Sequence, residues 1–403
     1  MKMLTLFFSF FAFAGLMAAY ITWRLFGAAR FSRIRQVAIA LGIFAIFLAV
    51  PLNIMLRRAG VNNAALEMLV WAGYVGVGFL SFIFTFLAIR DFLWVPAVLF
   101  KNIKRFLFEN TRENLPTGNP AHPGRRRFLV TGMNYGITAT ASIFTAYGFA
   151  EARQVPDVKE VTIPIIGLPD DFEGFRIVQI TDIHVSPTIR RDFVEAVVHA
   201  ANRLDADIIA LTGDLADGLV SQLADDVAPL KDLKSAAGNF FVTGNHEYYS
   251  GVDDWVRHVK RLGFTPLMNE HRLISRGKSR LLLAGVTDYR GGNFIRSHLS
   301  DPRKALAGAP SVHPKILLAH QPKSIFDAAK AGFDLQISGH THGGQFFPWN
   351  LLVGLDQPFV AGLGRYHGTQ IYVSRGTGYW GPPIRVGSPS EITRIKLTAR
   401  QRL

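Results

Sequence analysis

The chain has 403 residues, with 44 Lys and Arg against 30 Asp and Glu and a formal net charge of +14. It contains no cysteine, which excludes disulfide bonds and thiolate metal sites. The charge is uneven: residues 1–150 carry 15 basic and four acidic residues, so 11 of the 14 net charges lie there. Because the basic residues lie next to apolar segments, this charge distribution indicates membrane topology rather than nucleic-acid binding.

Three uncharged apolar segments lie within the first hundred residues, at 4–23, 37–56 and 68–89. Each is about 20 residues long, enough to cross a hydrocarbon core of about 30 Å. A fourth and weaker segment, residues 128–150, is rich in Gly, Thr, Ser and Ala and contains Asn134. The sequence therefore predicts a membrane region with three transmembrane helices and a basic cytoplasmic linker at 1–127. A fourth transmembrane or signal-anchor segment is expected at 128–150.

Arginine and lysine gather after the first and third apolar segments, which the positive-inside rule assigns to the cytoplasm. Residues after 150 are then expected on the periplasmic or extracellular side of a multi-pass inner-membrane protein. The run Arg125-Arg126-Arg127-Phe128-Leu129 resembles a twin-arginine export signal. The alternative is a plain basic flank of a transmembrane helix. Cleavage after residue 150 and the oligomeric state stay open.

Five short polar clusters each follow a β-type apolar run in the second half of the chain. They are Asp182-Ile183-His184, Gly213-Asp214, Gly244-Asn245-His246-Glu247, Ala319-His320-Gln321 and Gly339-His340-Thr341-His342-Gly343-Gly344. Ligand sites collect at strand ends of α/β sheets, so we expect all five along one sheet edge. Their carboxylates, imidazoles and amide suit hard or borderline divalent cations. A single such cluster is usually a turn or helix cap, but five in order are far more specific.

The order of these motifs, within residues 158–397, resembles the calcineurin-like metallophosphoesterase family. The resemblance implies an α/β fold over residues 155–403: a four-layer α/β/β/α sandwich of two mixed sheets. It also implies two divalent metal ions, for which Mn, Fe, Zn, Mg and Ni all remain open. The first would be held by Asp182, His184, Asp214 and His342, and the second by Asp214, Asn245, His320 and His340. Asp214 would bridge the two.

Two cations about 3.5 to 4 Å apart can clamp an in-line phosphoryl displacement and generate hydroxide from a bound water. A shared carboxylate such as that of Asp214 would hold them that close. His246 would then meet the leaving-group oxygen as a proton donor or electrostatic stabiliser. Glu247 is expected to be the partner of His246, and Asp288 to serve either a turn or a ligand.

The tail of the chain resembles a membrane-tethered bacterial subset of the family. Arg375 and Arg385 there are candidates to grip a substrate phosphate, the alternative being structural pairing with an acid such as Glu391. The apolar residues 346–353 follow the last polar cluster directly. They are either a membrane-facing lip or ordinary core packing.

The expected function is phosphoester hydrolysis at the outer face of the inner membrane, on a lipid-linked phosphate or phosphodiester. The expected partners are the bilayer and this substrate, with no nucleic acid. One alternative is a phosphodiesterase or nucleotidase for soluble substrates, in which the membrane part is only an anchor. Another is a non-catalytic membrane sensor or assembly protein.

Overall fold

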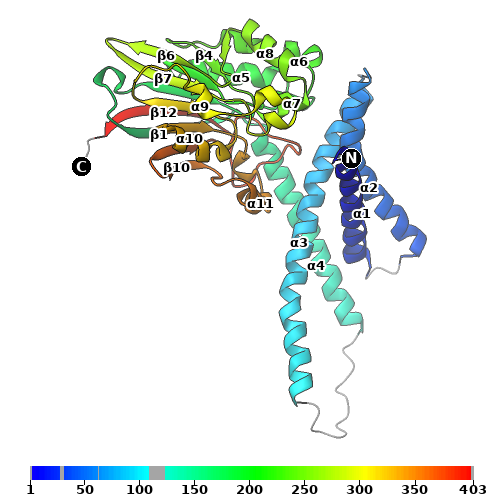
Figure 1. Cartoon of the computed structure of the whole chain (residues 1–403). Coiled ribbons are helices and arrows are strands. Elements are labelled where there is room, and N and C mark those ends of the chain that lie inside the picture. The colour runs from blue at the N-terminus through cyan, green and yellow to red at the C-terminus, as the bar shows by residue number, and fades with distance from the viewer. Residues whose placement is uncertain (1, 28–30, 62, 109–122, 401–403) are drawn as a thin grey trace. The chain divides into compact units, whose positions relative to one another are not determined.

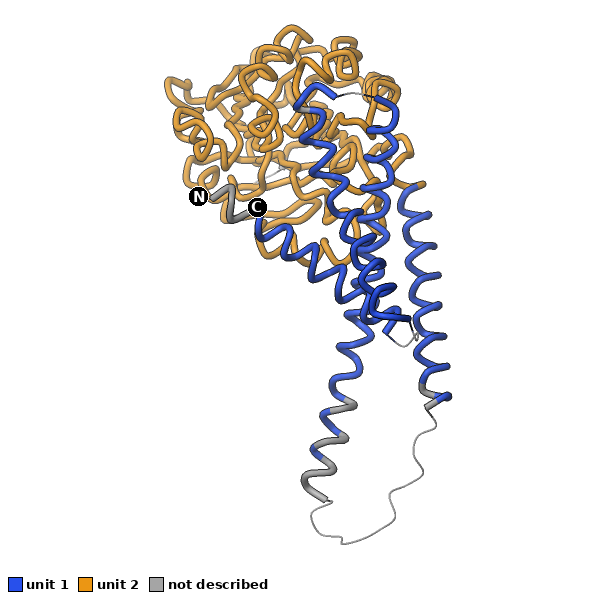
Figure 2. The backbone as a smooth tube through the Cα atoms, turned by 90° about the vertical axis from the view of Figure 1, so that its right-hand side faces the viewer, with its two compact units in different colours: residues 1–149 blue, residues 150–403 orange. Residues whose placement is uncertain are grey.

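The computed structural model describes residues 2–27, 31–61, 63–108 and 123–400 (Figure 1). Contacts divide the chain into two compact units, residues 1–149 (unit 1) and 150–403 (unit 2) (Figure 2). Unit 1 is helical, and the described strands all lie in unit 2. The predicted division of the membrane region at residue 127, and the start of the catalytic domain at residue 155, stay predictions.

Unit 1 is built from long apolar helices. They are α1 (Lys2–Phe26), α2 (Arg33–Arg58), α3 (Ala64–Phe108) and α4 (Pro123–Ala152), the last of which continues into unit 2. Within the described residues, three stretches are long and apolar enough to cross a membrane: Phe8–Phe26, Arg33–Arg57 and Ala64–Pro96. They overlap the three strong predicted spans. α3 continues past residue 89, the predicted end of the third span. Pro96 lies inside this helix and does not end it.

A polar network joins three helices of unit 1. Asp91 of α3 pairs with Arg24 of α1 and accepts a 2.7 Å hydrogen bond from the hydroxyl of Tyr20. Arg90 donates to the side-chain oxygen of Asn134 in α4 at 2.7 Å. Asn134 in turn donates to two backbone carbonyls near the end of α1. Polar side chains hold apolar helices together in this way, which accounts for Asn134 in the weak fourth segment.

Unit 2 contains two six-stranded sheets. The first has the order β1 (Asp157–Ile166), β12 (Glu391–Arg400), β2 (Arg176–Ile180), β3 (Ile208–Leu211), β4 (Asn239–Phe241) and β5 (Phe264–Pro266). The second has the order β10 (Gly362–Tyr366), β11 (Thr369–Val373), β9 (Leu335–Ser338), β8 (Lys315–Leu318), β7 (Ser279–Gly285) and β6 (Glu270–Arg276). Both are mixed: β2 to β5 and β7, β8, β9 and β11 run parallel, while β12 pairs antiparallel with β2, as do β6 with β7 and β10 with β11.

The two sheets pack face to face, with helices outside them (Figure 1). Apolar residues from both sheets, such as Ile177, Phe240, Leu283 and Ile337, share one buried cluster. A second cluster lies between the first sheet and the helices α5 (Arg191–Asn202), α6 (Val220–Val227) and α8 (Val252–Arg261). A third cluster lies between the second sheet and the helices α9 (Pro302–Ala305) and α10 (Ile325–Ala331). The predicted α/β sandwich of two mixed sheets flanked by helices is therefore confirmed.

The five polar clusters follow β2, β3, β4, β8 and β9. Within each sheet these strands are parallel, so their carboxyl ends share an edge. The clusters come from both sheets rather than from one, which differs from the single-sheet edge expected from the sequence. The site is thus built where the edges of two packed sheets meet.

Candidate metal centre

Most of the predicted metal ligands have a left-handed backbone conformation. The φ angles are 55° at Asp182, 53° at His184, 52° at Asp214, 73° at His340 and 50° at His342. Non-glycine residues rarely adopt this region, and holding one there costs about 1–3 kcal/mol. Such strain concentrates at functional sites, because the surrounding fold must enforce it.

Two glycines allow the loops to come together. A Cβ atom on Gly244 would lie 2.2 Å from Oδ1 of Asp214. A Cβ atom on Gly339 would lie 2.1 Å from Oδ2 of Asp182. Both distances are far below van der Waals contact, so only glycine lets these turns approach the carboxylates.

The first cluster of ligand atoms comes from Asp182, His184 and His342, all buried, with one atom of each within 4.8 Å of the others. Nε2 of His184 lies 3.0 Å from Nε2 of His342, which lies 3.6 Å from Oδ1 of Asp182. Two imidazole nitrogens that bind one cation at about 2.1 Å are separated by about 3 Å. The spacing therefore fits a shared cation.

The second cluster comes from Asp214, His320 and His340. Nε2 of His320 lies 3.1 Å from Oδ2 of Asp214 and 3.1 Å from Nδ1 of His340. Nδ1 of His320 donates to the carbonyl of Thr212 at 2.8 Å when it carries the proton, which leaves Nε2 free to bind a cation. This cluster has the same donor chemistry as the first.

Oδ2 of Asp214 lies between the two clusters, 3.1 Å from His320 and 3.8 Å from Nε2 of His184. Asn245 is also buried, and its Oδ1 accepts no hydrogen bond from any described residue. A buried carbonyl oxygen without a hydrogen-bond donor is costly unless a water molecule or an ion binds it. The donor set, its spacing and this orphaned oxygen fit a pair of divalent cations.

Burial and neighbouring charges shift the pKa values of several predicted ligands. Burial raises the pKa of the Asp182 carboxyl. Burial opposes the charged form of His320, but Asp214 outweighs it and raises the pKa of His320 well above its usual value. Burial and the neighbouring His320 lower the pKa of His340 to about 3. Divalent cations bind carboxylates and neutral imidazoles, so they would offset this buried charge.

Asp217, which is not among the residues predicted from the sequence, connects the first cluster to His246. Its Oδ1 lies 2.8 Å from Nδ1 of His184 and 2.6 Å from Nδ1 of His246. Burial alone would lower the pKa of His246, but Asp217 outweighs it and raises that pKa to about 9. Asp217 follows Asp214 by three residues in the same loop, and this spacing was the available signal.

Glu247 is not the partner of His246, contrary to the prediction. Its carboxylate accepts hydrogen bonds from the backbone N–H groups of Gly244 at 2.6 Å, Leu215 at 2.8 Å and Asp214 at 3.1 Å. Glu247 therefore ties together two loops that carry predicted metal ligands. Its side chain is fully buried. The backbone N–H groups of both loops lie beside its carboxylate, so these groups rather than His246 are its hydrogen-bond partners.

Asp288 supports the site from one side. Its carboxylate accepts hydrogen bonds from the Gln321 amide at 2.9 and 3.2 Å and from the backbone of Arg290 at 2.9 Å. Gln321 follows His320 directly. Asp288 thus fixes both its own turn and the residue next to a predicted ligand.

The two predicted substrate arginines pack into the tail of the chain. Arg375 pairs with Glu391 at 3.3 Å. Arg385 is fully buried and donates to the carbonyls of Ser388 at 2.8 Å and Gly378 at 3.0 Å, and it lies 3.1 Å from Nδ1 of His342. Their role in binding substrate stays a prediction, and these contacts favour the structural alternative.

Exposed aromatic rings surround His246. The ring centroids of Tyr249 and Trp380 lie 5.1 and 5.9 Å from that of His246, and Phe294 packs on Tyr249 at 5.6 Å. All three side chains are about half exposed. They form an apolar wall on the side of the candidate proton donor.

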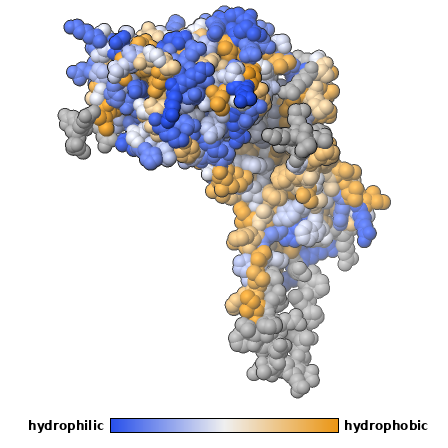
Figure 3. Space-filling model, in the orientation of Figure 1, coloured by the Kyte–Doolittle hydropathy of each residue, from blue (hydrophilic) through white to orange (hydrophobic). Residues whose placement is uncertain are grey.

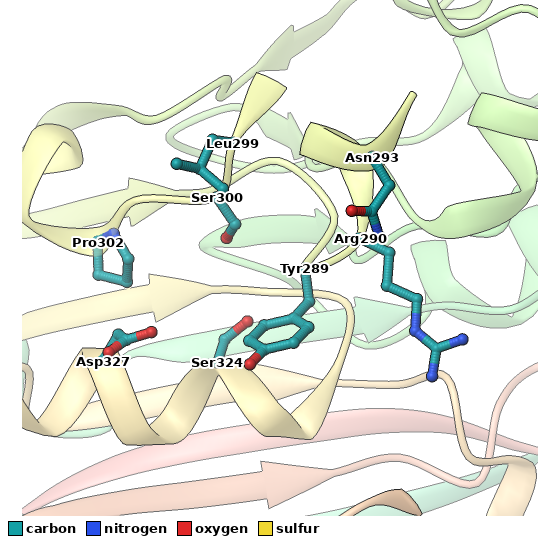
Figure 4. Close-up of a pocket in the computed structure, with 8 residues that line it drawn as sticks. All are labelled: Tyr289, Arg290, Asn293, Leu299, Ser300, Pro302, Ser324 and Asp327. Carbon is teal, nitrogen blue, oxygen red and sulfur yellow. The ribbon is translucent and has the colours of Figure 1, made fainter. Parts of the chain in front are cut away.

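A separate cavity of about 380 Å³ opens next to Asp288 in the chain. It is lined by Tyr289, Arg290, Asn293, Leu299, Ser300, Pro302, Ser324 and Asp327 (Figure 4). Oγ of Ser324 is buried there and has no hydrogen-bond partner among the described residues. None of the predicted metal ligands lines this cavity.

Comparison with known proteins identifies the family. The calcineurin-like phosphoesterase family model matches residues 175–344. A transmembrane protein with metallophosphoesterase domain from Danio rerio is 40% identical over 281 residues, covering 66% of this chain and 64% of that protein. Its counterpart from Bos taurus is 41% identical over 270 residues, covering 64% and 61%. The chain thus spans less than two thirds of the length of these two relatives.

An uncharacterized metallophosphoesterase from Helicobacter pylori is 39% identical over 280 residues, which cover 68% of this chain and 73% of that protein. The relatives come from animals as well as bacteria, so the likeness extends beyond the bacterial subset predicted from the tail. The matched residues include the five polar clusters that form the candidate metal centre. The chain belongs to the calcineurin-like metallophosphoesterase family.

Proposed function

We propose that the protein is a dinuclear-metal-dependent phosphoester hydrolase at the outer face of the inner membrane. The observation that carries the proposal is the position of Asp214. One of its carboxylate oxygens lies between two clusters of largely buried imidazole and carboxylate ligands. A bridging carboxylate is what a two-metal phosphoesterase site requires.

When bound, the two cations would polarise the phosphate and lower the pKa of the attacking water. Asp182, His184, Asp214 and His342 would hold one cation, and Asp214, Asn245, His320 and His340 the other. His246 serves the leaving group. Asp217 accepts a hydrogen bond from Nδ1 of His246 at 2.6 Å, and Nε2 of His246 lies 3.9 Å from Oδ2 of Asp214. A proton on Nε2 would then be available to the leaving group.

The proposed substrate is a lipid-linked phosphate or phosphodiester. Three candidate membrane spans in the same chain support it, as does the apolar wall of Tyr249, Phe294 and Trp380 beside His246. The two animal relatives are named transmembrane proteins. The basic residues after the first and third spans support the outer face as the location of unit 2.

The metal centre is tested by Asp214→Asn in the full-length protein, with the exposed Asp232→Asn as a matched control. We expect Asp214→Asn to lose most bound metal, measured by plasma mass spectrometry, and to lose activity toward a chromogenic phosphodiester. Asp232→Asn should retain both. Full metal content and activity in Asp214→Asn would contradict the bridging role.

The substrate is tested by assaying the metal-loaded protein against a phospholipid phosphate in vesicles, a nucleotide and a small chromogenic diester. Turnover of the lipid supports the proposal. Turnover of the nucleotide or diester without the lipid would support the soluble-substrate alternative. Two bound metals without turnover of any ester would support the non-catalytic alternative.

A further inference from the structure

The helix α11 (Trp349–Asp356) exposes an unusual amount of apolar surface. None of its side chains is buried. The exposed fractions are 40% for Phe347 and Trp349, 47% for Leu352, 61% for Leu351 and 84% for Leu355. We call these five side chains the α11 patch. Figure 3 shows hydrophobic surface on the part of unit 2 that Figure 1 labels α11. Clustered exposed apolar side chains of this kind mark interaction surfaces.

The segment that carries the α11 patch packs against the turn that contains His340 and His342. A Cβ atom on Gly344, the last residue of the His340–Gly344 cluster, would lie 2.1 Å from Cα of Asn350, so the helix rests directly on this turn. Phe346 is buried and anchors the start of the segment. Gln345 bonds reciprocally with the backbone of Trp380, which brings another exposed indole to the same side of the turn. The sequence alternatives for residues 346–353 thus divide: Phe346 is core, and the residues after it are exposed.

A positively charged edge borders the α11 patch. Asp356, at the end of the helix, is shared by Arg290 at 3.1 Å and Lys323 at 2.5 Å. Two cations surround one carboxylate, so the edge keeps a net positive charge. An exposed apolar helix beside cationic side chains is the arrangement that binds anionic lipid interfaces.

The chain that carries the α11 patch also carries a membrane tether of its own, in the form of three candidate membrane spans. A tethered surface meets the bilayer at a high effective concentration, whereas a soluble partner must be recruited. We therefore take lipid, rather than a soluble protein, as the partner of the α11 patch.

We propose that α11 seats unit 2 on the membrane, with the α11 patch inserted at the boundary between lipid headgroups and acyl chains. The turn that carries His340 and His342 is then held at the bilayer surface by the helix that rests on it. This contact depends on the apolar surface and the membrane tether. It does not depend on phosphoester hydrolysis, so it can hold or fail independently of the proposed function.

The natural chain has no cysteine, so single cysteines can report the position of α11 in the full-length protein. Leu352→Cys and Leu355→Cys are each labelled with a small fluorophore in vesicles of phosphatidylethanolamine and phosphatidylglycerol. Leu219→Cys, at the exposed N-terminus of α6, is the matched control. Figure 1 shows α6 and α11 on opposite sides of unit 2. Each label is quenched either by nitroxide-bearing lipid or by aqueous iodide.

We expect lipid-borne nitroxide to quench the labels at 352 and 355 at least about threefold more than the label at 219, because interfacial helices lie about 5–10 Å into the headgroup boundary. Iodide should show the opposite order. Iodide quenching at 352 and 355 equal to that at 219 would mean that α11 faces water, and would overturn the proposal. Protection from both quenchers would mean that protein covers α11, which would also overturn it.

A second measurement guards against a folding defect in the labelled variants. Trp349→Phe preserves an aromatic ring, and it should reduce the quenching of tryptophan fluorescence by brominated phospholipid. Trp255→Phe is the paired comparison, since Trp255 is buried inside unit 2 and should not meet lipid. Unchanged lipid quenching in Trp349→Phe would count against the proposal, whatever the labels report.

Discussion

At the scale of single residues, the site depends on two carboxylates that do different work. Asp214 lies between the two ligand clusters, whereas Asp217 contacts Nδ1 of His184 and Nδ1 of His246. A hydrogen bond to one ring nitrogen fixes the tautomer and leaves the other nitrogen available. One carboxylate can therefore prepare His184 for metal binding and His246 for proton transfer.

His246→Ala should separate chemistry from metal binding. His246 meets the leaving group in the proposed mechanism and is not a predicted ligand. We expect turnover of a chromogenic phosphodiester to fall about 10²-fold or more, with metal content nearly unchanged. Metal analysis of the purified variant decides the point, and a loss of metal equal to that of Asp214→Asn would make His246 a ligand.

Asp217→Asn should affect both properties. An amide can still contact His184 and His246, but it no longer carries the charge that holds their Nδ1 protons. We expect turnover to fall, and metal affinity to weaken by about 10–100-fold, the usual cost of removing the partner of a metal ligand. Titration with a metal chelator measures the affinity. Wild-type chelator sensitivity would mean that Asp217 acts on His246 alone.

At the scale of elements, the site depends on how closely two strand-end loops can approach. Gly244 precedes Asn245 and meets the Asp214 loop, and the Glu247 carboxylate bonds the backbone of both loops. The φ of Gly244 is −98°, so its backbone would accept any residue. Contact with Asp214 is what requires glycine here.

Gly244→Ala should therefore damage the metal centre by steric overlap. We expect a loss of stability of about 1–3 kcal/mol and a loss of bound metal, because Asp214 must move to admit the new methyl group. Gly368→Ala is the matched control, since a Cβ there meets nothing within 4 Å, and it should stay within about 0.5 kcal/mol of the natural protein. Thermal unfolding and metal analysis test the pair. Equal behaviour would show that the two loops can separate.

Much of unit 2 could be predicted from the sequence, because each site strand is a short apolar run that ends in a polar cluster. In α5, Val194, Val197 and Val198 recur at helical spacing, and all three are buried on one face. That face has the helical period, which a single sequence displays directly.

The rest depended on contacts between distant segments. In the sequence, Asp217 resembles an ordinary acidic loop residue, because its contact with His246 is formed only in the folded chain. The role of Glu247 was mistaken because its neighbour in the sequence is not its neighbour in space. The sequence does not specify the helix α11, because a short apolar run is compatible with a loop, a buried strand or a short helix.

At the scale of the whole molecule, the two units differ in charge and in hydropathy. Unit 1 carries the membrane-spanning candidates and most of the net positive charge, while unit 2 carries the candidate metal centre and is nearly neutral overall. Net charge of this kind orients a chain in a membrane. It contributes nothing to the chemistry of the metal centre.

The charge distribution predicts the side of the membrane on which unit 2 lies. Arg24, Arg30, Arg33 and Arg35 lie around the junction between the first and second spans. Arg57 and Arg58 lie around the junction between the second and third spans, near the acidic Glu67. By the positive-inside rule the first loop is cytoplasmic, and so is the basic segment after the third span. If residues 128–150 cross the membrane again or act as an export signal, unit 2 is delivered outside the cytoplasm.

Reporter fusions after Leu403 test this topology. An alkaline phosphatase fused there should be active, because it folds only outside the cytoplasm, and a green fluorescent protein exported through the general secretion route should stay dark. Arg125→Lys with Arg126→Lys tests the export route, since a twin-arginine signal requires the guanidinium pair whereas a basic flank needs only positive charge. Normal phosphatase activity in that variant would leave residues 128–150 as a simple anchor. A fluorescent and phosphatase-inactive fusion of the natural chain would place unit 2 in the cytoplasm, and the proposed outer-face substrate would have to be abandoned with it.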